Sequence, residues 1–364
     1  MILGIDLLWL DNSYKGGVEK VIFNLMDGFN TLNYNDKIIL FCNQYGLNKL
    51  KHLNHKKYKI VHIEMKNNSL FYKLLIRTFV LQRLVKQEKV DVFLFPKIYT
   101  GFKKFNIPTV VIPHDIQFKR HPLQSRFKNF IVSILYYIDF HIRDSIIAIS
   151  DFDKQEIEKF YPNIKRKITK IYNPIKINNY INTKQNNKYF IAINVGYRHK
   201  NILTLLKAFQ KFSKKYKFNL ILVGRNYHNL NINETIRRLN INEFVTYKEY
   251  VEQQELDSLL LNAFCYITTS KYEGFGLTVA EAIMYKIPVI SSVQPALMEV
   301  SMGMSIYYSP IDDPDSLYRV MEKFIHNRPS DKYLERIRNK ATILYNYKKI
   351  SREYFEHFKS LQKE

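Results

Sequence analysis

One segment, residues 270–282, constrains the fold more than any other part of the chain. It follows an apolar run at 263–269 that predicts a buried strand, and it leads into a predicted helix at 282–285. A second apolar run at 287–290 predicts the next strand. This order is typical of an α/β protein with a parallel sheet, in which ligands bind at the carboxyl ends of the strands.

The turn in this segment carries groups that suit an anionic or hydroxyl-rich ligand. Gly274 and Gly276 lack a Cβ, so backbone N–H groups can approach a ligand closely, and the helix N-terminus adds partial positive charge. Glu273 precedes the helix, and we expect Glu281 in its first turn. A structural interpretation stays open, because Thr278 and Glu281 match a capping box and the glycines can simply shape a turn.

Length and composition set the class of protein. A chain of 364 residues with 46% hydrophobic residues is typical of two domains with separate cores. The longest apolar run, 130–138, falls short of the ~20 residues that a membrane span needs. Residues 1–6 predict a first strand and not a signal peptide, since they lack a basic region. Cys42 and Cys265 lie in predicted strands, so we expect reduced core thiols in a cytoplasmic protein.

The charge balance points to anionic partners. A formal net charge of +23, from 56 Lys and Arg against 33 Asp and Glu, attracts nucleic acid or anionic lipid. The alternative is an Ile-, Asn- and Lys-rich composition whose lysines are merely solvated. The basic amphipathic helix predicted at 71–86 fits a membrane surface as well as the cover of a sheet. The sequence contains no RNA- or DNA-binding motif, so no nucleic-acid partner is expected.

Strands alternate with helices along the whole chain. The predicted strands are 2–8, 37–42, 58–63, 90–95, 109–112, 145–149, 168–172, 189–195, 219–223, 245–247, 263–269, 287–290 and 305–308. The main predicted helices are 71–86, 130–142, 153–160, 256–261, 314–324, 333–344 and 349–362. Ser150 with Asp153 predicts a helix cap, and the polar segment 178–188 predicts a linker.

Three further turns are candidate sites. Gly16 and Gly17 stand between a strand and a helix without forming a dinucleotide fingerprint, and a plain turn is the simpler interpretation. Arg198 and Lys200 follow a glycine turn, where cationic side chains can hold a diphosphate; a basic surface loop is the alternative. His114 lies at the carboxyl end of a strand, well placed for chemistry or for a structural hydrogen bond to its neighbour.

Metal signals are weak in this sequence. Asp313 and Asp315 flank Pro314, a pattern that predicts a helix start with Asp at the N-cap and Pro at the first position. No zinc-type Cys and His spacing occurs. We therefore expect neither a metal nor another cofactor.

These motifs together resemble the GT-B glycosyltransferases of family GT4, which are retaining enzymes that use nucleotide-diphospho-sugars. The resemblance rests on residues 271–277 with 288–290, on 195–202, on 16–19, and on 111–115, which is similar to bacterial mannosyl- and rhamnosyltransferase-like members. It implies an α/β fold of two Rossmann-like, doubly wound parallel-sheet domains facing a cleft. The implied parts are an acceptor-side domain at 1–178, a nucleotide-sugar domain at 179–345, and a C-terminal helix at 346–364 that crosses back to the first domain.

The resemblance also implies roles for the donor-side residues. Glu273 would face the donor hexose, and Glu281 would accept hydrogen bonds from the ribose hydroxyls. Lys200, together with Arg198, would neutralise the diphosphate. The backbone around the sugar and phosphate would come from Gly274, Phe275, Gly276 and Leu277.

The first domain would complete the site. Gly16 and Gly17 would close on the diphosphate, and His114 would line the cleft near the transferred sugar and the acceptor. The catalytic set implied by the resemblance is thus His114, Glu273 and Lys200.

The activity implied by the resemblance is metal-independent, retaining transfer of a hexose to a saccharide or polyprenyl-linked glycan. Lipopolysaccharide or capsule would be the product, made in the cytoplasm or at the inner, anionic face of the membrane. Two alternatives from other classes are a basic nucleic-acid-binding protein and a catalytically silent sugar-nucleotide-binding subunit.

Overall fold

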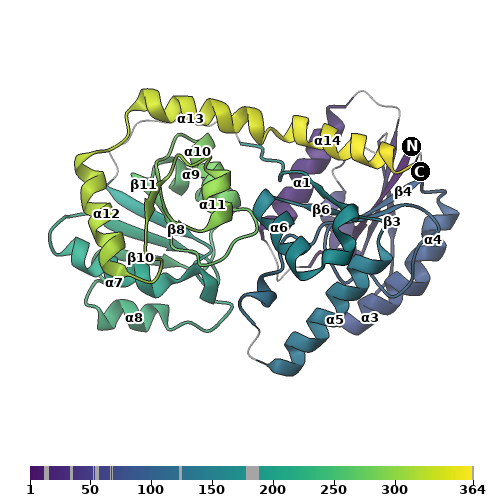
Figure 1. The fold of residues 1–364 in the computed structure, drawn as a ribbon, viewed down its shortest axis with the longest axis horizontal. Coiled ribbons are helices and arrows are strands. Elements are labelled where there is room, and N and C mark those ends of the chain that lie inside the picture. Colours follow the sequence, from purple (N-terminus) through teal and green to yellow (C-terminus); the bar gives the residue numbers. More distant parts are fainter. Residues whose placement is uncertain are drawn as a thin grey trace. The chain divides into compact units, whose positions relative to one another are not determined.

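The chain forms two compact units, Met1–Pro174 with Asn346–Glu364, and Ile175–Tyr345 (Figure 1). The structure is a computed structural model that describes residues 1–11, 16–32, 36–51, 53, 57–65, 67, 69–122, 125–177 and 188–362. The expected linker at 178–188 lies outside the described residues except for Lys188. The boundary between units precedes it, because buried Ile175 donates its N–H to the Tyr345 carbonyl of the second unit at 2.9 Å.

The first unit contains a seven-stranded parallel sheet in the order β3-β2-β1-β4-β5-β6-β7. The first six strands in this order have the Rossmann arrangement, with a switch point between β1 and β4. The strands are β1 (Ile2–Leu7), β2 (Lys37–Cys42), β3 (Tyr58–His62), β4 (Val92–Phe95), β5 (Thr109–Val111), β6 (Ser145–Ala148) and β7 (Ile168–Lys170).

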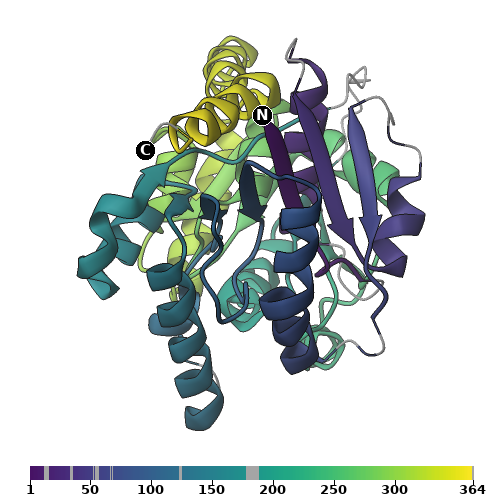
Figure 2. The same ribbon diagram turned by 90° about the vertical axis from the view of Figure 1, so that its right-hand side faces the viewer.

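Helices cover both faces of this sheet. They are α1 (Gly17–Asn30), α2 (Gln44–Leu50), α3 (Leu70–Leu75), the π-helix η1 (Ile76–Leu81), α4 (Gln82–Gln87), η2 (Gln117–Lys119), α5 (Arg126–Ile142), α6 (Asp151–Phe160), η3 (Pro162–Lys167) and α14 (Tyr347–Ser360). In Figure 2, α3 and α5 both extend toward one end of the first unit and are separated from each other.

Burial on both faces explains the continuous apolar strands, since helices cover a parallel sheet on each side. Leu3, Ile5 and Leu7 of β1 are all buried. Gly4 is required between them, because a Cβ there would lie 2.5 Å from the ring of Phe93 on the neighbouring strand. In the core of the first unit, the Phe93 ring thus packs directly against the backbone of Gly4.

The second unit repeats this architecture with six parallel strands in the order β10-β9-β8-β11-β12-β13, so its switch point lies between β8 and β11. Its strands are β8 (Tyr189–Ile193), β9 (Asn219–Val223), β10 (Val245–Lys248), β11 (Cys265–Thr268), β12 (Val289–Ser292) and β13 (Ile306–Tyr308). Its helices are η4 (Arg198–Lys200), α7 (Ile202–Ser213), α8 (Ile232–Arg238), α9 (Gln253–Leu261), α10 (Leu277–Met284), α11 (Pro295–Val300), α12 (Pro314–His326) and α13 (Asp331–Leu344).

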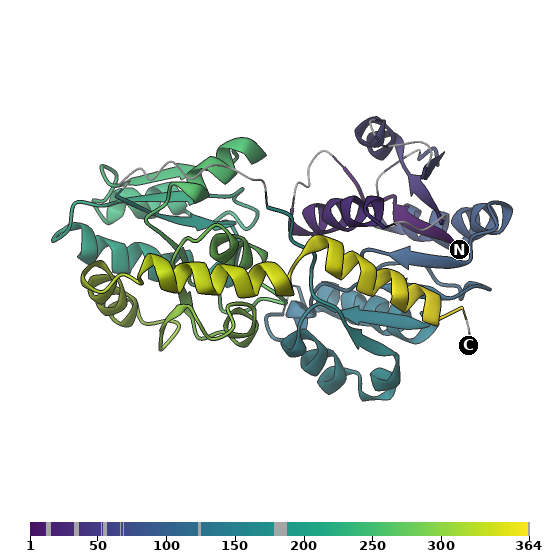
Figure 3. The ribbon, with the colours of Figure 1, turned by 90° about the horizontal axis from the view of Figure 1, so that it is seen from above.

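The last helix belongs to the first unit. It packs along α1 (Figure 3), where the Phe29 ring lies 6.0 Å from Phe355 and 6.4 Å from Phe358. A Cβ on Gly28 would lie 1.9 Å from Ser351 Oγ, so the two helices meet where only a glycine fits. The chain thus returns to the first unit to cover its first helix.

The predicted fold class is confirmed, and local differences have physical causes. Helix α10 begins at Leu277 after Gly276, which has φ +99°, so the capping-box interpretation of Thr278 is wrong and Glu281 lies beyond the first turn. Asp313 caps α12 as expected, accepting bonds from the Asp315 and Ser316 amides. The helix expected at 71–86 contains the π-helix η1, and α5 begins four residues earlier than predicted, at Arg126. Within the described ranges, no helix has the length and apolarity to cross a membrane.

Candidate functional site

Two loops meet at the carboxyl edge of the second sheet, beside its switch point. One follows β8 and leads through η4 into α7; the other follows β11 and leads into α10. The Lys271 N–H donates to the His199 carbonyl at 2.7 Å, and the Thr269 hydroxyl donates to the Lys200 carbonyl at 2.7 Å. Strand adjacency therefore joins two motifs that are far apart in the sequence.

An ion pair between Lys200 Nζ and a carboxylate oxygen of Glu273 lies at this junction. The two side chains are 17% and 16% exposed, so the pair is largely removed from water yet reachable. Burial raises the pKa of Glu273, but Lys200, His199 and a hydrogen bond from Ser270 together hold that pKa below its ordinary value. Glu273 is consequently a carboxylate at neutral pH, beside a fixed ammonium group.

Glu281 belongs to the same corner of the unit. It is buried on α10, and its charge acts on Tyr266 of β11. Burial raises the pKa of the Tyr266 phenol, and the charges of Glu273 and Glu281 raise it further, whereas hydrogen bonds with Thr268 and Thr278 lower it. Both acids expected from the sequence thus act electrostatically on one tyrosine, which sequence reasoning did not single out.

The glycine loop has a rigid shape. Gly276 is the N-cap of α10 with φ +99°, a conformation that disfavours side chains, and a Cβ there would lie 2.5 Å from Leu297. No side chain caps this helix N-terminus. Phe275 packs edge-on against Tyr345 at 5.5 Å, so it offers the site its backbone and not its ring. Gly274, Gly276 and Leu277 lie in the same loop.

Two buried side chains support this loop from β12 and the turn after it. Gln294 is 1% exposed; its amide donates to the Glu273 carbonyl at 3.2 Å, and its oxygen accepts from the Leu297 N–H. The Ser292 hydroxyl donates to the Ser270 carbonyl at 2.7 Å. Sequence reasoning missed both residues, although a polar pair directly after an apolar strand was a usable signal.

The loop after β8 separates the two predicted cations. Gly196 is required because a Cβ would lie 1.8 Å from the Arg225 carbonyl oxygen. Arg198 is exposed, and its backbone N–H donates to His228 Nδ1 at 3.1 Å. Lys200 is half-buried and contacts Glu273. The geometry therefore favours Lys200 over Arg198 as the cation of this site.

In the first unit, Gly16 is the N-cap of α1 and Gly17 its first residue, and no side chain caps this end. Residues 12–15 of the preceding loop lie outside the described part of the chain. Glu19 in the first turn is buried and pairs with Lys49. That these glycines face a diphosphate stays a prediction.

His114 follows β5 with φ +66°, and its Nε2 lies 2.8 Å from the Pro96 carbonyl oxygen. A carbonyl only accepts, so Nε2 carries the proton and Nδ1 is an acceptor. Burial lowers the pKa of His114 to about 4, with a further contribution from Lys97. The imidazole is neutral at pH 7, and Nδ1 can accept a hydrogen bond.

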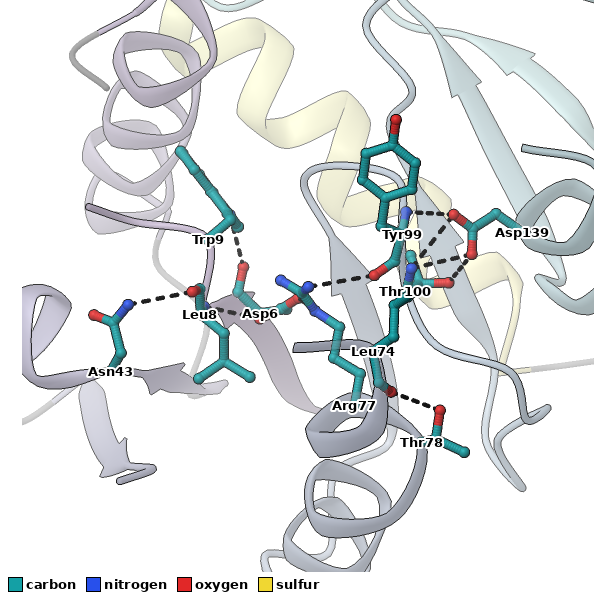
Figure 4. Close-up of polar contacts among 10 residues, drawn as sticks. All are labelled: Asp6, Leu8, Trp9, Asn43, Leu74, Arg77, Thr78, Tyr99, Thr100 and Asp139. Carbon is teal, nitrogen blue, oxygen red and sulfur yellow. Dashed lines mark hydrogen bonds and ion pairs between the residues drawn. The ribbon is translucent and has the colours of Figure 1, made fainter. Parts of the chain in front are cut away.

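A buried polar network fixes the loops after β1 and β4, at the first sheet's switch point (Figure 4). Asp6 accepts a 2.6 Å bond from Arg77 of the π-helix, which also donates to the Tyr99 carbonyl. Asp139 accepts from the backbone N–H groups of Tyr99 and Thr100. The network holds both loops in place at the edge where a ligand of such a sheet binds.

Two residues on these loops were missed by the sequence reasoning. Lys97 Nζ lies 5.3 Å from the ring of Trp9, whose indole N–H donates to the Asp6 carbonyl at 3.0 Å. Burial lowers the pKa of Lys97, and Arg77 and Lys73 lower it too, although Asp11 opposes them. The signal was available, since Trp9 is the single tryptophan of the chain and follows the first strand.

Comparison with known families decides the class of protein. The model described as glycosyl transferases group 1 matches residues 175–343, and that described as glycosyltransferase family 4 matches 15–179. Together they span most of the chain, one model for each unit. The chain belongs to the GT4 glycosyltransferases.

Two relatives of this chain carry names that refer to the O-antigen. The O-antigen chain mannosyltransferase RfbU of Salmonella typhimurium is 31% identical over 169 residues, covering 46% of this chain and 47% of the relative. The O-antigen biosynthesis glycosyltransferase WclY of Escherichia coli is 29% identical over 177 residues, covering 46% and 49%. The chain thus spans about half the length of the curated relatives it matches.

A solved structure shares the fold. Anabaena HepE, in complex with UDP and glucose, has a TM-score of 0.73 at 16% identity, with 99% of each chain covered. The fold of this chain is therefore GT-B, as expected. Among the residues that the structure describes, no group of three His, Cys, Asp or Glu side chains could hold a metal ion; metal independence of this GT4 protein stays a prediction.

Proposed function

We propose that the protein transfers a hexose from a nucleotide-diphospho-sugar to a saccharide or polyprenyl-linked acceptor, with retention of configuration and without a metal. The observation that carries the proposal is the Lys200–Glu273 ion pair at the β8/β11 switch point, beside an uncapped helix N-terminus. The names of the relatives RfbU and WclY support a role in O-antigen or related polysaccharide assembly. The HepE complex with UDP and glucose supports a sugar-nucleotide donor.

The mechanism follows from where charge develops. Breaking the anomeric C–O bond leaves negative charge on the diphosphate and positive charge on the sugar. Lys200 and the first backbone N–H groups of α10 would stabilise the diphosphate, because donors held in place need little reorganisation. The ionised Glu273 would bind the hexose hydroxyls, and its negative charge would stabilise the positive charge that develops on the sugar. Glu281 would bind the ribose.

The acceptor would attack the anomeric carbon from the same face of the sugar from which the diphosphate leaves. Its oxygen forms the new bond to the anomeric carbon while the sugar–phosphate bond breaks, and its proton passes to the departing diphosphate oxygen. This balance needs no external base or metal. His114, neutral with Nδ1 as an acceptor, would instead orient the acceptor or a sugar hydroxyl.

We also propose that the reaction takes place at the cytoplasmic face of a membrane, where a lipid-linked acceptor would be found. The net charge of +23 supports attraction to anionic headgroups.

A nucleotide panel tests the donor half of the proposal. Thermal shifts are measured with UDP, GDP, ADP and their sugars, on the protein and on Glu281→Gln. We expect one base to raise the melting temperature, and Glu281→Gln to need about tenfold or more nucleotide for the same shift, since an NH2 donor replaces one of the two buried oxygens that would accept ribose hydrogen bonds. No shift with any nucleotide would refute the proposal.

A further inference from the structure

The first half of α5 lacks the cover that its apolar sequence demands. None of the residues 126–134 is buried, and the helix extends away from the body of the first unit (Figure 2). Five large apolar side chains are exposed on it: Phe127 (71%), Phe130 (62%), Ile131 (38%), Ile134 (41%) and Tyr137 (55%). We call these five residues the α5 stripe.

The stripe forms one face of the helix. At 3.6 residues per turn its members fall within about 120° of arc, which is the width of an apolar face that normally contacts a partner. The opposite face packs on the unit through buried Leu135, Tyr136 and Phe140. The stripe therefore points away from the core of the first unit. Apolar residues exposed singly and by chance would not recur along one face of a helix.

A second apolar pair lies at the same end of the unit. Leu70 (43% exposed) and Phe71 (67%) begin α3, and the N-terminal ends of α3 and α5 lie at one end of the first unit in two perpendicular views (Figures 1 and 2). Exposed apolar residues at the starts of two helices thus lie at the same end of this unit.

The charges around the stripe specify its partner. Arg126 and Lys128, both exposed, flank the stripe on either side of the helix in its first turn, which contains no acidic residue. Cations at a helix N-terminus oppose the helix dipole, so this arrangement is unfavourable in isolation. An anionic surface would place negative charge beside the two cationic side chains and beside the positive end of the helix dipole, and so would stabilise both.

We propose that the α5 stripe inserts into the headgroup region of an anionic lipid bilayer, with Arg126 and Lys128 binding lipid phosphates. A shallow apolar face with flanking cations is the pattern of a helix that lies in a membrane interface. A second copy of the chain fits this face less well, because it would bring the same cations against each other. The inference rests on the proposed function for its purpose, which is access to a lipid-linked acceptor, but its evidence is independent of the donor site.

Vesicle flotation tests the proposal. Vesicles of phosphatidylcholine alone are compared with vesicles that also contain phosphatidylglycerol, at low and high salt. The variants are Phe127→Ser with Phe130→Ser, and Arg126→Gln with Lys128→Gln. The matched control is Ile343→Ser, which removes a 70% exposed apolar side chain of the second unit.

We expect the wild type and Ile343→Ser to float with anionic vesicles, and each double variant to lose about tenfold or more of its binding. The Arg126→Gln, Lys128→Gln protein should also lose salt sensitivity. No flotation of the wild type, equal loss in Ile343→Ser, or unchanged binding of the double variants would overturn the proposal. A dimer in light scattering that the Phe127→Ser, Phe130→Ser change dissociates would assign the stripe to a second copy and overturn it too.

A separate measurement distinguishes this proposal from the proposed function. Nucleotide thermal shifts report the second unit, so the stripe variants should retain them together with wild-type melting temperatures. Flotation without any nucleotide shift would leave the docking surface intact and refute the transferase. A nucleotide shift without flotation would leave the transferase proposal intact and refute the docking surface.

Discussion

At the scale of single residues, Glu273 keeps a pKa below its ordinary value although burial raises it. Burial raises its pKa, and the ammonium of Lys200 is the largest influence that brings it back below the ordinary value. The two residues are 73 positions apart in sequence. The pKa of this carboxylate therefore depends most on a distant cation, with smaller contributions from His199 and Ser270.

Replacing that cation should change both rate and pH dependence. In Lys200→Ala, burial becomes dominant and the pKa of Glu273 rises. We expect donor turnover to fall about 10²-fold or more, and the acid limb of the kcat/KM profile to move to higher pH. The control is Lys211→Ala, which removes an exposed ion pair with Asp315 in the same unit. A wild-type rate and profile in Lys200→Ala would contradict the assignment.

His114 links stability to pH with a definite sign. Its pKa is lowered from 6.5 to about 4 by burial and by Lys97. Between these two values the unfolded chain binds a proton that the folded chain does not, so the free energy of unfolding decreases as pH falls through this window.

The variant His114→Asn removes this linkage and retains a residue that tolerates positive φ. We expect the wild type to lose more stability than the variant between pH 6.5 and pH 4, and the two to be parallel above pH 7. Urea unfolding at a series of pH values measures this. Parallel curves throughout would show that the imidazole titrates normally in the folded protein.

At the scale of elements, the α1–α14 contact depends on a bare backbone. The Ser351 hydroxyl donates to the Leu25 carbonyl at 3.1 Å, directly over Gly28. Close helix approach of this kind needs a small residue on one side, because interiors pack densely and tolerate little added volume.

Gly28→Ala should therefore lower the free energy of unfolding by about 1–3 kcal/mol through overpacking. Ser351→Gly removes the side chain that the new methyl meets, so the double variant should be more stable than the sum of the single changes predicts. Chemical denaturation of all four proteins completes the cycle. Strict additivity would mean that the two residues do not meet.

At the scale of the whole molecule, one helix from the end of the chain completes the first unit. Phe355 and Phe358 of α14 cover Phe29 of α1, whereas the second unit has its own core. The first unit is thus discontinuous in sequence and the second is continuous.

Ending the chain at Tyr345 should destabilise the first unit and leave the second unit folded. Loss of α14 exposes the apolar face of α1, so we expect a lower melting temperature for the first unit and rapid proteolysis within it. The second unit should keep its nucleotide-dependent thermal shift. Calorimetry with and without nucleotide measures both, and an unchanged first transition would contradict the role given to α14.

Local patterns in the sequence were enough to predict the two parallel-sheet units and many helix caps. Ser150 and Asp313 cap their helices as expected, and β9 has the predicted bounds. Such features depend on a few neighbouring residues, so a short window contains their cause. The start of α10 was misplaced because Gly276 is its N-cap with φ +99°, and the Leu297 side chain that a Cβ there would meet lies outside that window.

The sequence by itself determined the class of fold, the order of strands and helices, and a candidate list that included Lys200, Glu273 and Glu281. Tertiary structure alone decided that Lys200 meets Glu273, that Gln294 supports their loop, and that an apolar face of α5 is exposed. The reason is physical: propensity and periodicity act over a few residues, whereas contact and exposure depend on which strands are neighbours and on what packs against a face.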